Sequence, residues 1–587
     1  MPIDKRWVIK EQGEPEKVRD LSTKLNIPPV LANLLVQRGI ETYEEATRFF
    51  NPRLSDLHDP FLMKDMDKAV ERIDRAVRNG EKIMVYGDYD VDGCTAVALV
   101  YTFLRSRGHK NLTFYIPDRY TEGYGVSIAS IDYAERKGVG LIIALDCGIK
   151  AVEKVAYAAS KGIDFIICDH HLPGEEIPAA VAVLDPKRED CHYPFDELSG
   201  CGVGFKLVQG YAQKKGIPFS EVEKLLDLVV VSTAADIVPL TGENRILAYY
   251  GLRKLNENPR KGLASVIRIC KLDNHHLITI DDIVFKIGPR INAAGRMRVD
   301  PNDPDAAPSG GHKAVEMLIE RDEQAAERCG DVIDEFNQNR KSIDRNVTQE
   351  AHDIIEGNEE MKSHKSIVIY NPQWMKGIVG IVASRLIETY YKPTVVLTMS
   401  NNFATGSARS VAGFDLYQAV ESCSDLLENF GGHMYAAGLT MKPENVEEFT
   451  RRFHAYVEEH IDPALLVPQV EVDSELLFSD ITPSFRAVLS RFQPFGPGNN
   501  APVFATRGVS NRGDAKLVGA DMEHIKMDLT QRQKPNTTIG AIAFQQPTHF
   551  DWIRNGRPVD VCYSIVENHY RGVTTPQLRI KDIKPLR

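Results

Sequence analysis

The chain lacks several features that define other classes of protein. Its nine cysteines include no CxxC pair, so neither a zinc ribbon nor a disulfide framework is indicated. No apolar run approaches the roughly 20 residues of a membrane-spanning helix, and the polar start MPIDKRWVIKEQ has no apolar stretch typical of a secretory signal. Neither GxSxG nor GxxxxGK[ST] occurs, so two common hydrolase motifs are excluded. We therefore expect a cytoplasmic protein that does not contact a membrane.

The chain also has little positive charge relative to its negative charge. The formal net charge of −11 argues, taken alone, against a nucleic-acid partner. This objection is weak for 587 residues, because local basic patches set phosphate affinity and metal-binding carboxylates add negative charge that bound cations cancel. A chain of this length exceeds one hydrophobic core, so we expect about three or four domains.

Alternating helix and strand patterns begin near residue 64. Short apolar runs rich in β-branched residues (KIMVYG, LTFYIP, GLIIAL, DFIIC, AAVAVL) alternate with helical stretches such as TAVALVYTFLRSRG. This alternation predicts an α/β fold with a parallel sheet. A second α/β unit has SIVIYN, PTVVLTM and FATGSAR as strands and DLYQAVESCSDLLENF as a helix. From about residue 468, short strands without long helices predict a small OB-like β-barrel.

These patterns predict five segments. They are an N-terminal helical lead-in over 1–60, a first α/β domain over 61–300, an insertion loop and long connecting helix over 301–360, a second α/β domain over 361–463, and an OB-like domain over 464–587. The loop rich in Pro, Asp and Gly spans 299–311, and apolar residues at helical spacing predict one long helix over 312–356.

Acidic and histidine side chains follow three of the strands expected in the first α/β domain. They are Asp88, Asp90 and Asp92 after the first, Asp146 after the second, and Asp169, His170 and His171 after the third. AADIVPL adds Asp236 at the end of a buried helix. Asp236 alone is more often a helix-terminal or turn aspartate, and His170 alone is more often a hydrogen-bonded structural histidine. Jointly they favour a metal cluster, because parallel strands about 4.8 Å apart end at one edge of the sheet and carboxylates suit Mg²⁺ or Mn²⁺.

The order of these motifs resembles a known family. DYDVDG, LDCGI, DHH and AADIVPL are similar to the four motifs of the DHH phosphoesterase superfamily. KIGPRINAAGRM, GSARS, GGHMYAAG and PFGPGNNAPVF resemble motifs of RecJ exonucleases, including their DHHA1 and OB domains, although Asn500 stands where the family usually has proline. The resemblance covers about residue 80 to the last residue. It implies a metal-dependent enzyme that degrades single-stranded DNA from its 5′ end to 5′-mononucleotides, in DNA repair and recombination.

The resemblance also implies roles for individual residues. Two divalent cations, Mn²⁺ or Mg²⁺, would be held by Asp88, Asp90, Asp92, Asp146, His170 and Asp236. Asp169 would orient His170, His171 would contact the scissile phosphate, and Arg290 would act with Asp146, His170 and His171 in catalysis. Substrate would be bound by Arg119, Arg290, Asn292, Ser407, Arg409, Gly431, Gly432 and His433. Among these, Arg119, Ser407 and Arg409 resemble a pocket for a terminal 5′ phosphate.

Plainer interpretations stay open for some of these residues. Arg119 and Arg409 could form surface salt bridges, and Gly431, Gly432 and His433 could end a helix formed by DLLENF. Two other functions also stay open: a DHH phosphodiesterase for short oligonucleotides, and a non-catalytic relative that binds single-stranded DNA. The C-terminal β domain has no evident use for a two-nucleotide substrate, and a non-catalytic relative would be expected to lose metal ligands. The resemblance implies single-stranded DNA, single-strand-binding protein and a helicase as partners of a monomeric chain.

Overall fold

The computed structural model describes residues 4–272, 277–297, 309–531, 534–570 and 573–586. The chain divides into two compact units. The one named here the N-terminal unit comprises Gly13–Asn337 and Ser484–Ala501, and the C-terminal unit comprises Met1–Gln12, Gln338–Pro483 and Pro502–Arg587. Residues 299–308 of the expected Pro, Asp and Gly-rich loop lie outside the described residues. No described helix is long and apolar enough to cross a membrane.

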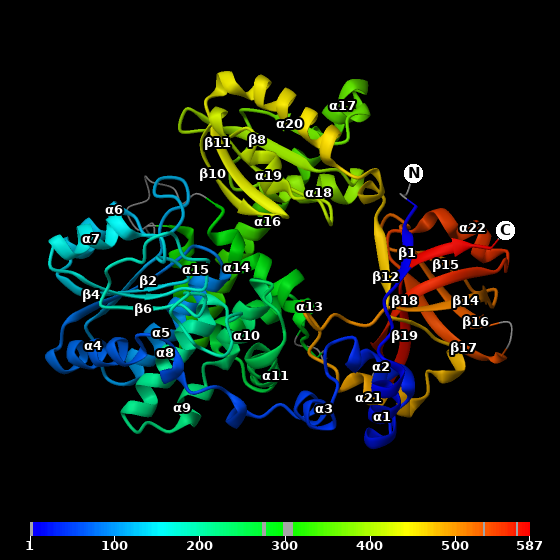
Figure 1. The fold of residues 1–587 in the computed structure, drawn as a ribbon, viewed down its shortest axis with the longest axis horizontal. Helices are drawn as coiled ribbons and strands as arrows, with labels where there is room; N and C mark the ends of the chain where they lie inside the picture. The colour runs from blue at the N-terminus through cyan, green and yellow to red at the C-terminus, as the bar shows by residue number, and fades with distance from the viewer. Residues whose placement is uncertain (1–3, 273–276, 298–308, 532–533, 571–572, 587) are drawn as a thin grey trace. The chain divides into compact units, whose positions relative to one another are not determined.

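A five-stranded parallel sheet forms the centre of the N-terminal unit (Figure 1). In spatial order its strands are β3 (Leu112–Tyr115), β2 (Lys82–Gly87), β4 (Val139–Leu145), β5 (Asp164–Cys168) and β6 (Ala182–Leu184). The strands are apolar along most of their length because helices cover both faces of the sheet. The predicted α/β fold with a parallel sheet is confirmed, and β4 lies in the middle.

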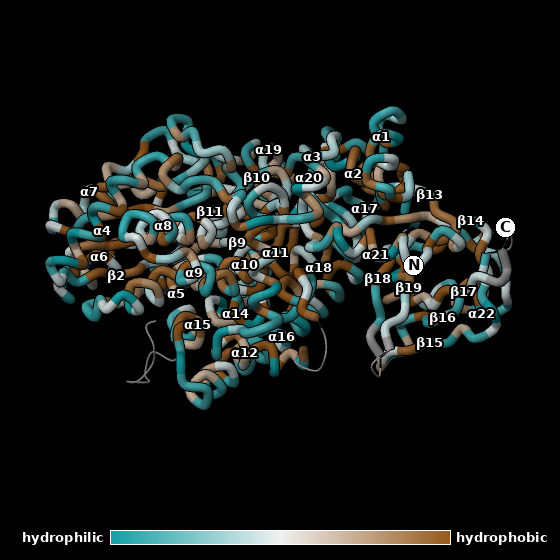
Figure 2. Tube along the Cα trace, turned by 90° about the horizontal axis from the view of Figure 1, so that it is seen from below, coloured by the Kyte–Doolittle hydropathy of each residue, from teal (hydrophilic) through white to brown (hydrophobic). Residues whose placement is uncertain are grey.

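Helices pack on both faces of this sheet (Figure 1). One face carries α4 (Met66–Asn79), α5 (Val91–Ser106) and α8 (Gly200–Lys214), and the other carries α6 (Ile128–Arg136) and α7 (Val152–Ser160). The remaining helices of the unit are α1 (Pro15–Leu25), α2 (Pro29–Val36), α3 (Tyr43–Phe50), α9 (Phe219–Glu223), α10 (Leu226–Ala235), α11 (Gly242–Glu257), α12 (Lys261–Ile269), α13 (Ile280–Asp282), the π-helix η3 (Ile283–Ile287), α14 (Gly288–Ala294), α15 (Gly310–Ile319) and α21 (Pro483–Ser490). Hydrophobic segments run through the interior, with hydrophilic segments outside (Figure 2).

The C-terminal unit contains a mixed sheet. In spatial order its strands are β10 (Leu427–His433), β11 (Ala436–Met441), β9 (Phe403–Arg409), β8 (Thr394–Ser400) and β7 (Ile367–Tyr370). Only β7 and β8 pair in parallel, and the other neighbours are antiparallel. The accompanying helices are α17 (Glu359–Ser363), α18 (Val379–Tyr390), α19 (Leu416–Glu421) and α20 (Val446–His460).

The predicted OB-like barrel is confirmed in the same unit. Its strands are β13 (Ser474–Glu475), β14 (Phe504–Asn511), β15 (Lys516–Val518), β16 (His524–Gln531), β17 (Lys534–Ala543), β18 (Val559–Tyr570) and β19 (Val573–Pro585), with α22 (Phe550–Arg554) between β17 and β18. The pairing of β14 with β16, in addition to β18, closes the sheet.

Three local expectations differ from the structure. The lead-in begins with a strand, β1 (Arg6–Ile9), which pairs in parallel with β12 (Gln469–Val472). The single helix expected over 312–356 is wrong: α15 ends at Ile319 and α16 spans Glu323–Glu356. The Asp322 carboxylate accepts a hydrogen bond from the Ala325 amide at 2.9 Å, so it caps a new helix.

The helix expected over DLYQAVESCSDLLENF is also wrong in its second half. It ends at Glu421, and Leu427–His433 forms the edge strand β10. Pairing with β11 supplies backbone hydrogen bonds to a segment whose two glycines disfavour a helix. The interpretation of Gly431, Gly432 and His433 as a helix end is therefore excluded.

Candidate metal centre

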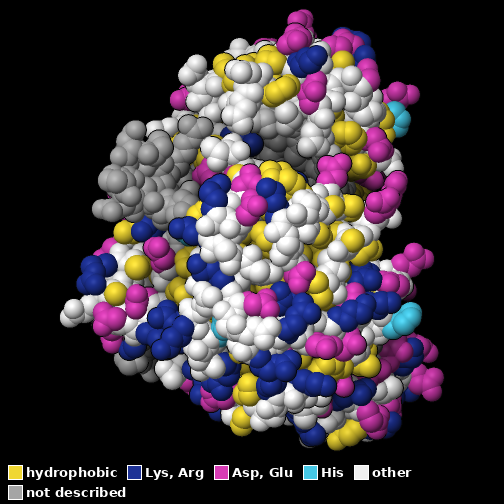
Figure 3. All heavy atoms as spheres, turned by 90° about the vertical axis from the view of Figure 1, so that its left-hand side faces the viewer, with side chains coloured by type: hydrophobic (Ala, Val, Ile, Leu, Met, Phe, Trp, Pro, Cys, Tyr) yellow, Lys and Arg dark blue, Asp and Glu magenta, His cyan; other side chains and the backbone are white. Residues whose placement is uncertain are grey.

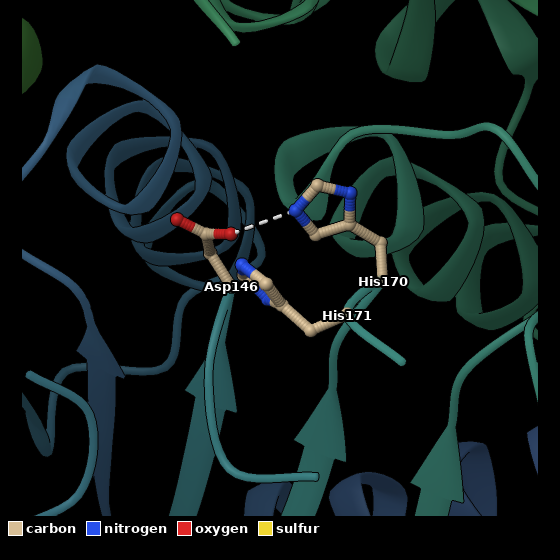
Figure 4. A group of neighbouring side chains, drawn as sticks. All are labelled: Asp146, His170 and His171. Carbon is tan, nitrogen blue, oxygen red and sulfur yellow. Dashed lines mark ion pairs between the residues drawn. The ribbon is translucent and has the colours of Figure 1, made fainter. Parts of the chain in front are cut away.

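The carboxyl ends of β2, β4 and β5 bring the predicted acidic and histidine residues together. Asp88 follows β2, Asp146 follows β4, and His170 follows β5 by two residues. Asp146 adopts a left-handed backbone conformation with φ 59°, which turns the chain sharply above the middle of the sheet. Its carboxylate points toward the His170 ring (Figure 4).

His170 lies at the centre of the cluster. Its Nε2 is 3.2 Å from Asp146 Oδ1, 3.7 Å from Asp236 Oδ2 and 3.8 Å from Asp92 Oδ2. Two groups have ligand atoms that all lie within 4.8 Å of one another: Asp146, His170 and His171, and Asp92, His170 and Asp236. Oxygen and nitrogen donors at this spacing can surround metal ions.

Asp92 is held by the first turn of α8. Its carboxylate accepts hydrogen bonds from the amides of Gly200 and Cys201, both at 2.7 Å, and from Ser232 Oγ at 2.7 Å. A side chain at Gly200 would place its Cβ 2.5 Å from Asp146 Cβ, so glycine is required for this approach. These supports were not predicted from the sequence, although Ser199 followed by glycine in LSGCG is a helix-start signal.

The resemblance implied that Asp169 orients His170, but in the structure its carboxylate does not bond to the His170 ring. Its Oδ1 lies 2.7 Å from His171 Nδ1, and the carboxylate also accepts the backbone amides of His170, His171 and Ile149. The carboxylate therefore fixes the His171 ring and the loop backbone. Tyr124, which was not predicted, places its hydroxyl 3.3 Å from His171 Nε2 and from the carbonyl of Asp146.

Burial and like charge act against ionisation of the cluster carboxyls. Burial, and next the charge of Asp90, raise the pKa of Asp88 well above its ordinary value. Burial and the neighbouring Asp92 raise the pKa of both Asp146 and Asp236. Burial lowers the pKa of His170, which keeps the imidazole neutral, the form that ligates metals.

The donor set fits divalent cations. Within the described residues, Asp88 Oδ1 and both ring nitrogens of His170 are buried without a hydrogen-bond partner. Buried polar atoms are normally paired, so these atoms need another partner. Cations would also offset the repulsion among the carboxylates. One carboxylate oxygen of Asp90, Oδ1, also caps α5 by accepting the Gly93 amide at 3.0 Å.

The other residues predicted in the N-terminal unit make internal contacts. Asn292 Oδ1 accepts the Val91 amide at 3.0 Å and so supports the DYDVDG loop. Arg290 donates to Asp334 at 2.9 Å and to the Lys286 carbonyl at 2.9 Å. The Arg119 guanidinium lies 4.0 Å from the centroid of the Tyr89 ring, so it forms a cation–π contact and no salt bridge among the described residues.

The predicted residues of the C-terminal unit lie on two strands of one sheet, β9 and β10. Arg409 on β9 donates to Ser407 Oγ at 2.6 Å and to the Ala408 carbonyl at 2.8 Å. Burial lowers the pKa of Arg409. Gly431, Gly432 and His433 lie on β10, separated from β9 by β11. Ser407 and Arg409 belong to a different unit from Arg119.

One outer face of the molecule bears charges of both signs. Figure 3 shows Lys and Arg side chains interspersed with Asp and Glu side chains across this face. The negative charge of the chain is therefore not gathered there, in contrast to the strand ends that carry Asp88, Asp92 and Asp146.

Comparison with known proteins agrees with this arrangement. Residues 82–233 match the DHH family, N-terminal domain, residues 364–459 the DHHA1 domain and residues 472–582 the RecJ OB domain. The single-stranded-DNA-specific exonuclease RecJ of Bacillus subtilis (strain 168) is 36% identical over 98% of this chain and 70% of its own length. That of Escherichia coli (strain K12) is 32% identical over 99% of this chain and 100% of its own length.

Solved structures show the same fold. RecJ from Thermus thermophilus in complex with Mn²⁺ matches with a TM-score of 0.81 at 24% identity, covering 99% of this chain and 80% of that chain. An exonuclease RecJ bound to manganese matches with a TM-score of 0.58 at 28% identity, covering 70% of this chain and 98% of that chain. The fold and the ordered strand-end motifs are those of the DHH phosphoesterases. Within that class, the chain belongs to the RecJ family of single-stranded-DNA-specific exonucleases.

Proposed function

We propose that the chain is a 5′-to-3′ exonuclease that hydrolyses single-stranded DNA to 5′-mononucleotides with two divalent cations, Mn²⁺ or Mg²⁺. The observation that carries the proposal is the position of His170 Nε2 within 3.8 Å of carboxylate oxygens from Asp146, Asp236 and Asp92. The relatives named above, which are exonucleases specific for single-stranded DNA, support the choice of substrate.

The residues proposed to hold the cations are Asp88, Asp90, Asp92, Asp146, His170 and Asp236. Bound there, the cations would supply Lewis-acid stabilisation of phosphate oxygens and a water nucleophile at neutral pH. His171, fixed by Asp169, would contact the scissile phosphate. Arg119, Arg290 and Asn292 would hold substrate beside the metals, and Ser407, Arg409 and the Gly431–His433 strand would bind the nucleotide at the 5′ end.

The proposal is tested on single strands labelled at the 5′ or the 3′ end, incubated with Mn²⁺. We expect labelled mononucleotide to appear at once from 5′-labelled DNA and late from 3′-labelled DNA. Early release of the 3′ label would contradict the polarity. Cleavage confined to dinucleotides would instead favour a phosphodiesterase for short oligonucleotides, and tight DNA binding without cleavage would favour a non-catalytic relative.

A further inference from the structure

The loop that follows Asp236 contains a strained residue. Ile237 has φ 61°, a left-handed conformation that is a genuine outlier for a β-branched side chain. Its side chain is 61% exposed, so apolar packing does not explain the conformation. Strained residues of this kind persist only where the surrounding structure holds them, and they are concentrated at functional sites. Something other than Ile237 itself must therefore fix the direction in which the chain leaves Asp236.

The opposite end of this loop is held by a segment distant in sequence. The Leu240 amide donates to the Pro497 carbonyl at 2.7 Å. Residues 491–500, RFQPFGPGNN, are named here the clasp segment, and they pack within the N-terminal unit although the strands of the OB-like barrel flank them in sequence. Their fit against the loop is close, because a Cβ at Gly496 would lie 2.6 Å from Leu240 Cδ1 and one at Gly498 would lie 2.9 Å from Thr241 Cγ2.

Asn499 holds the clasp segment in its shape. It is 1% exposed, and its Nδ2 donates to the carbonyls of Phe492 at 2.8 Å and Pro494 at 2.9 Å. Its Oδ1 accepts from Arg38 Nε at 2.9 Å. Removing the side chain would leave buried polar groups without these partners, which is costly.

Arg245 fastens the same segment to the core of the unit. Its guanidinium donates to the carbonyls of Arg491 at 3.2 Å, Phe492 at 3.0 Å and Gln493 at 3.0 Å. It also lies 3.8 Å from the centroid of the Phe49 ring. Since Arg245 lies in the first turn of α11, which follows the loop directly, the clasp segment is bonded both to the loop at Leu240 and to the helix that the loop enters.

We infer that the clasp segment, through Asn499, is a positioning element for the metal ligand Asp236. By holding Leu240 it keeps Ile237 in the left-handed turn that ends α10, and so it fixes the last turn of α10, whose C-cap residue Asp236 lies beside His170 and Asp92. The inference rests on the proposed metal site, and it assigns part of that site's geometry to a segment lying between strands of the OB-like barrel in sequence.

The decisive variant is Asn499→Ala in the full chain, measured by Mn²⁺ binding without DNA. We expect Mn²⁺ affinity to fall about tenfold, the usual size of effect when the support of a metal ligand is removed. The Mn²⁺ concentration for half-maximal cleavage should rise by the same factor, while kcat at saturating Mn²⁺ changes little. Asn500→Ala is the matched control, because the Asn500 side chain is exposed and only its carbonyl accepts from Arg38 at 2.8 Å.

Two double variants separate positioning from general stability. In an Asp236→Ala background, Asn499→Ala should cause no further loss of Mn²⁺ affinity, because the ligand that it positions is gone. Ile237→Asn should restore most of the affinity of Asn499→Ala, since asparagine adopts the left-handed conformation readily. If Asn499→Ala fails to fold, Gly496→Ala replaces it in both double variants.

Three results would overturn the inference. The first is an unchanged Mn²⁺ affinity in Asn499→Ala. The second is an equal loss of Mn²⁺ affinity from Asn499→Ala in the wild type and in the Asp236→Ala background, and the third is no recovery of affinity when Ile237→Asn is added to Asn499→Ala. Since Mn²⁺ binding is measured without DNA, these results are independent of whether the chain cuts single-stranded DNA. Failure of the proposed function would appear instead as normal Mn²⁺ binding without cleavage.

Discussion

The sheet β2–β6 carries buried negative charges, and the sheet β7–β11 carries a half-buried positive charge. In the first, Asp88, Asp92 and Asp146 are all under 4% exposed and repel one another. In the second, the guanidinium of Arg409 bonds to the neutral Ser407 hydroxyl and Ala408 carbonyl, and no carboxylate of the described residues pairs with it. Burial of an unbalanced charge is costly. The first region therefore suits cations and the second suits an anion such as a phosphate.

The largest expected effect concerns the acidic cluster at the sheet β2–β6. Asp146→Ala should lower the rate of cleavage on the order of a thousandfold, a typical cost of removing a group that stabilises the transition state. Binding of single-stranded DNA should change little. Asp196→Ala, at an exposed aspartate of the same unit, is the control. Cleavage measured under single turnover and Mn²⁺ binding by calorimetry check the prediction, and unchanged values for both would remove Asp146 from the site.

The second prediction concerns Arg409 on the sheet β7–β11. Arg409→Ala should reduce the preference for 5′-phosphorylated over 5′-hydroxyl DNA by about tenfold, because one charge-assisted hydrogen bond is lost. The metal-dependent cutting step should be affected much less. Initial rates on the two substrates give the ratio, with Arg451→Ala on α20 as the exposed control. An unchanged ratio would mean that the anion site lies elsewhere.

The third prediction uses stability to compare Asp146 with and without metal. In EDTA, Asp146→Asn should raise the melting temperature by roughly 2–4 °C, because one member of a repelling cluster is neutralised. With saturating Mn²⁺ the order should reverse, since the wild type gains binding energy that the variant lacks. Thermal melts under the two conditions test this, and a variant less stable in both would show that the carboxylate has a structural role without metal.

The smallest expected effect involves a histidine that must stay neutral. Burial, and next the charge of His364, lower the pKa of His454 from 6.5 to about 4. The unfolded chain therefore takes up this proton first, so stability is lost as pH falls from about 6.5 toward 4. After allowance for solvent screening the loss is about 1 kcal/mol. Urea melts at pH 7 and pH 5 should show a smaller difference for His454→Gln than for the wild type.

The sequence was most informative where local signals agreed with the fold. Strand runs ending in Asp88, Asp146 and His170 predicted a shared edge because parallel strands have only one arrangement of their carboxyl ends. The prediction was wrong where two local structures were compatible with the same residues. Leu427 and Phe430 fit a helical spacing, and only pairing with β11, which depends on the tertiary structure, makes them a strand.

The sequence does not predict which side chains of the site bond to one another. Asp169 comes directly before the two histidines, and only the three-dimensional structure shows that it bonds to the ring of His171. The attachment of residues 491–500 to the core of the N-terminal unit joins groups far apart in the chain, since Arg245 and Phe492 are separated by 247 residues. Neither periodicity nor composition carries such information.

The short parallel pairing of β1 with β12 has a consequence for synthesis of the chain. The Lys10–Asp473 contact beside it joins residues 463 positions apart. At a synthesis rate of roughly 5–20 residues per second, β1 leaves the ribosome roughly 20–90 s before its partner exists. During that interval the strand has unsatisfied edges and an apolar Trp7, which favour association with other chains. Newly made protein should therefore depend on chaperones until residue 472 has emerged. In a variant without the other two tryptophans, Trp7 fluorescence would report when β1 pairs with β12.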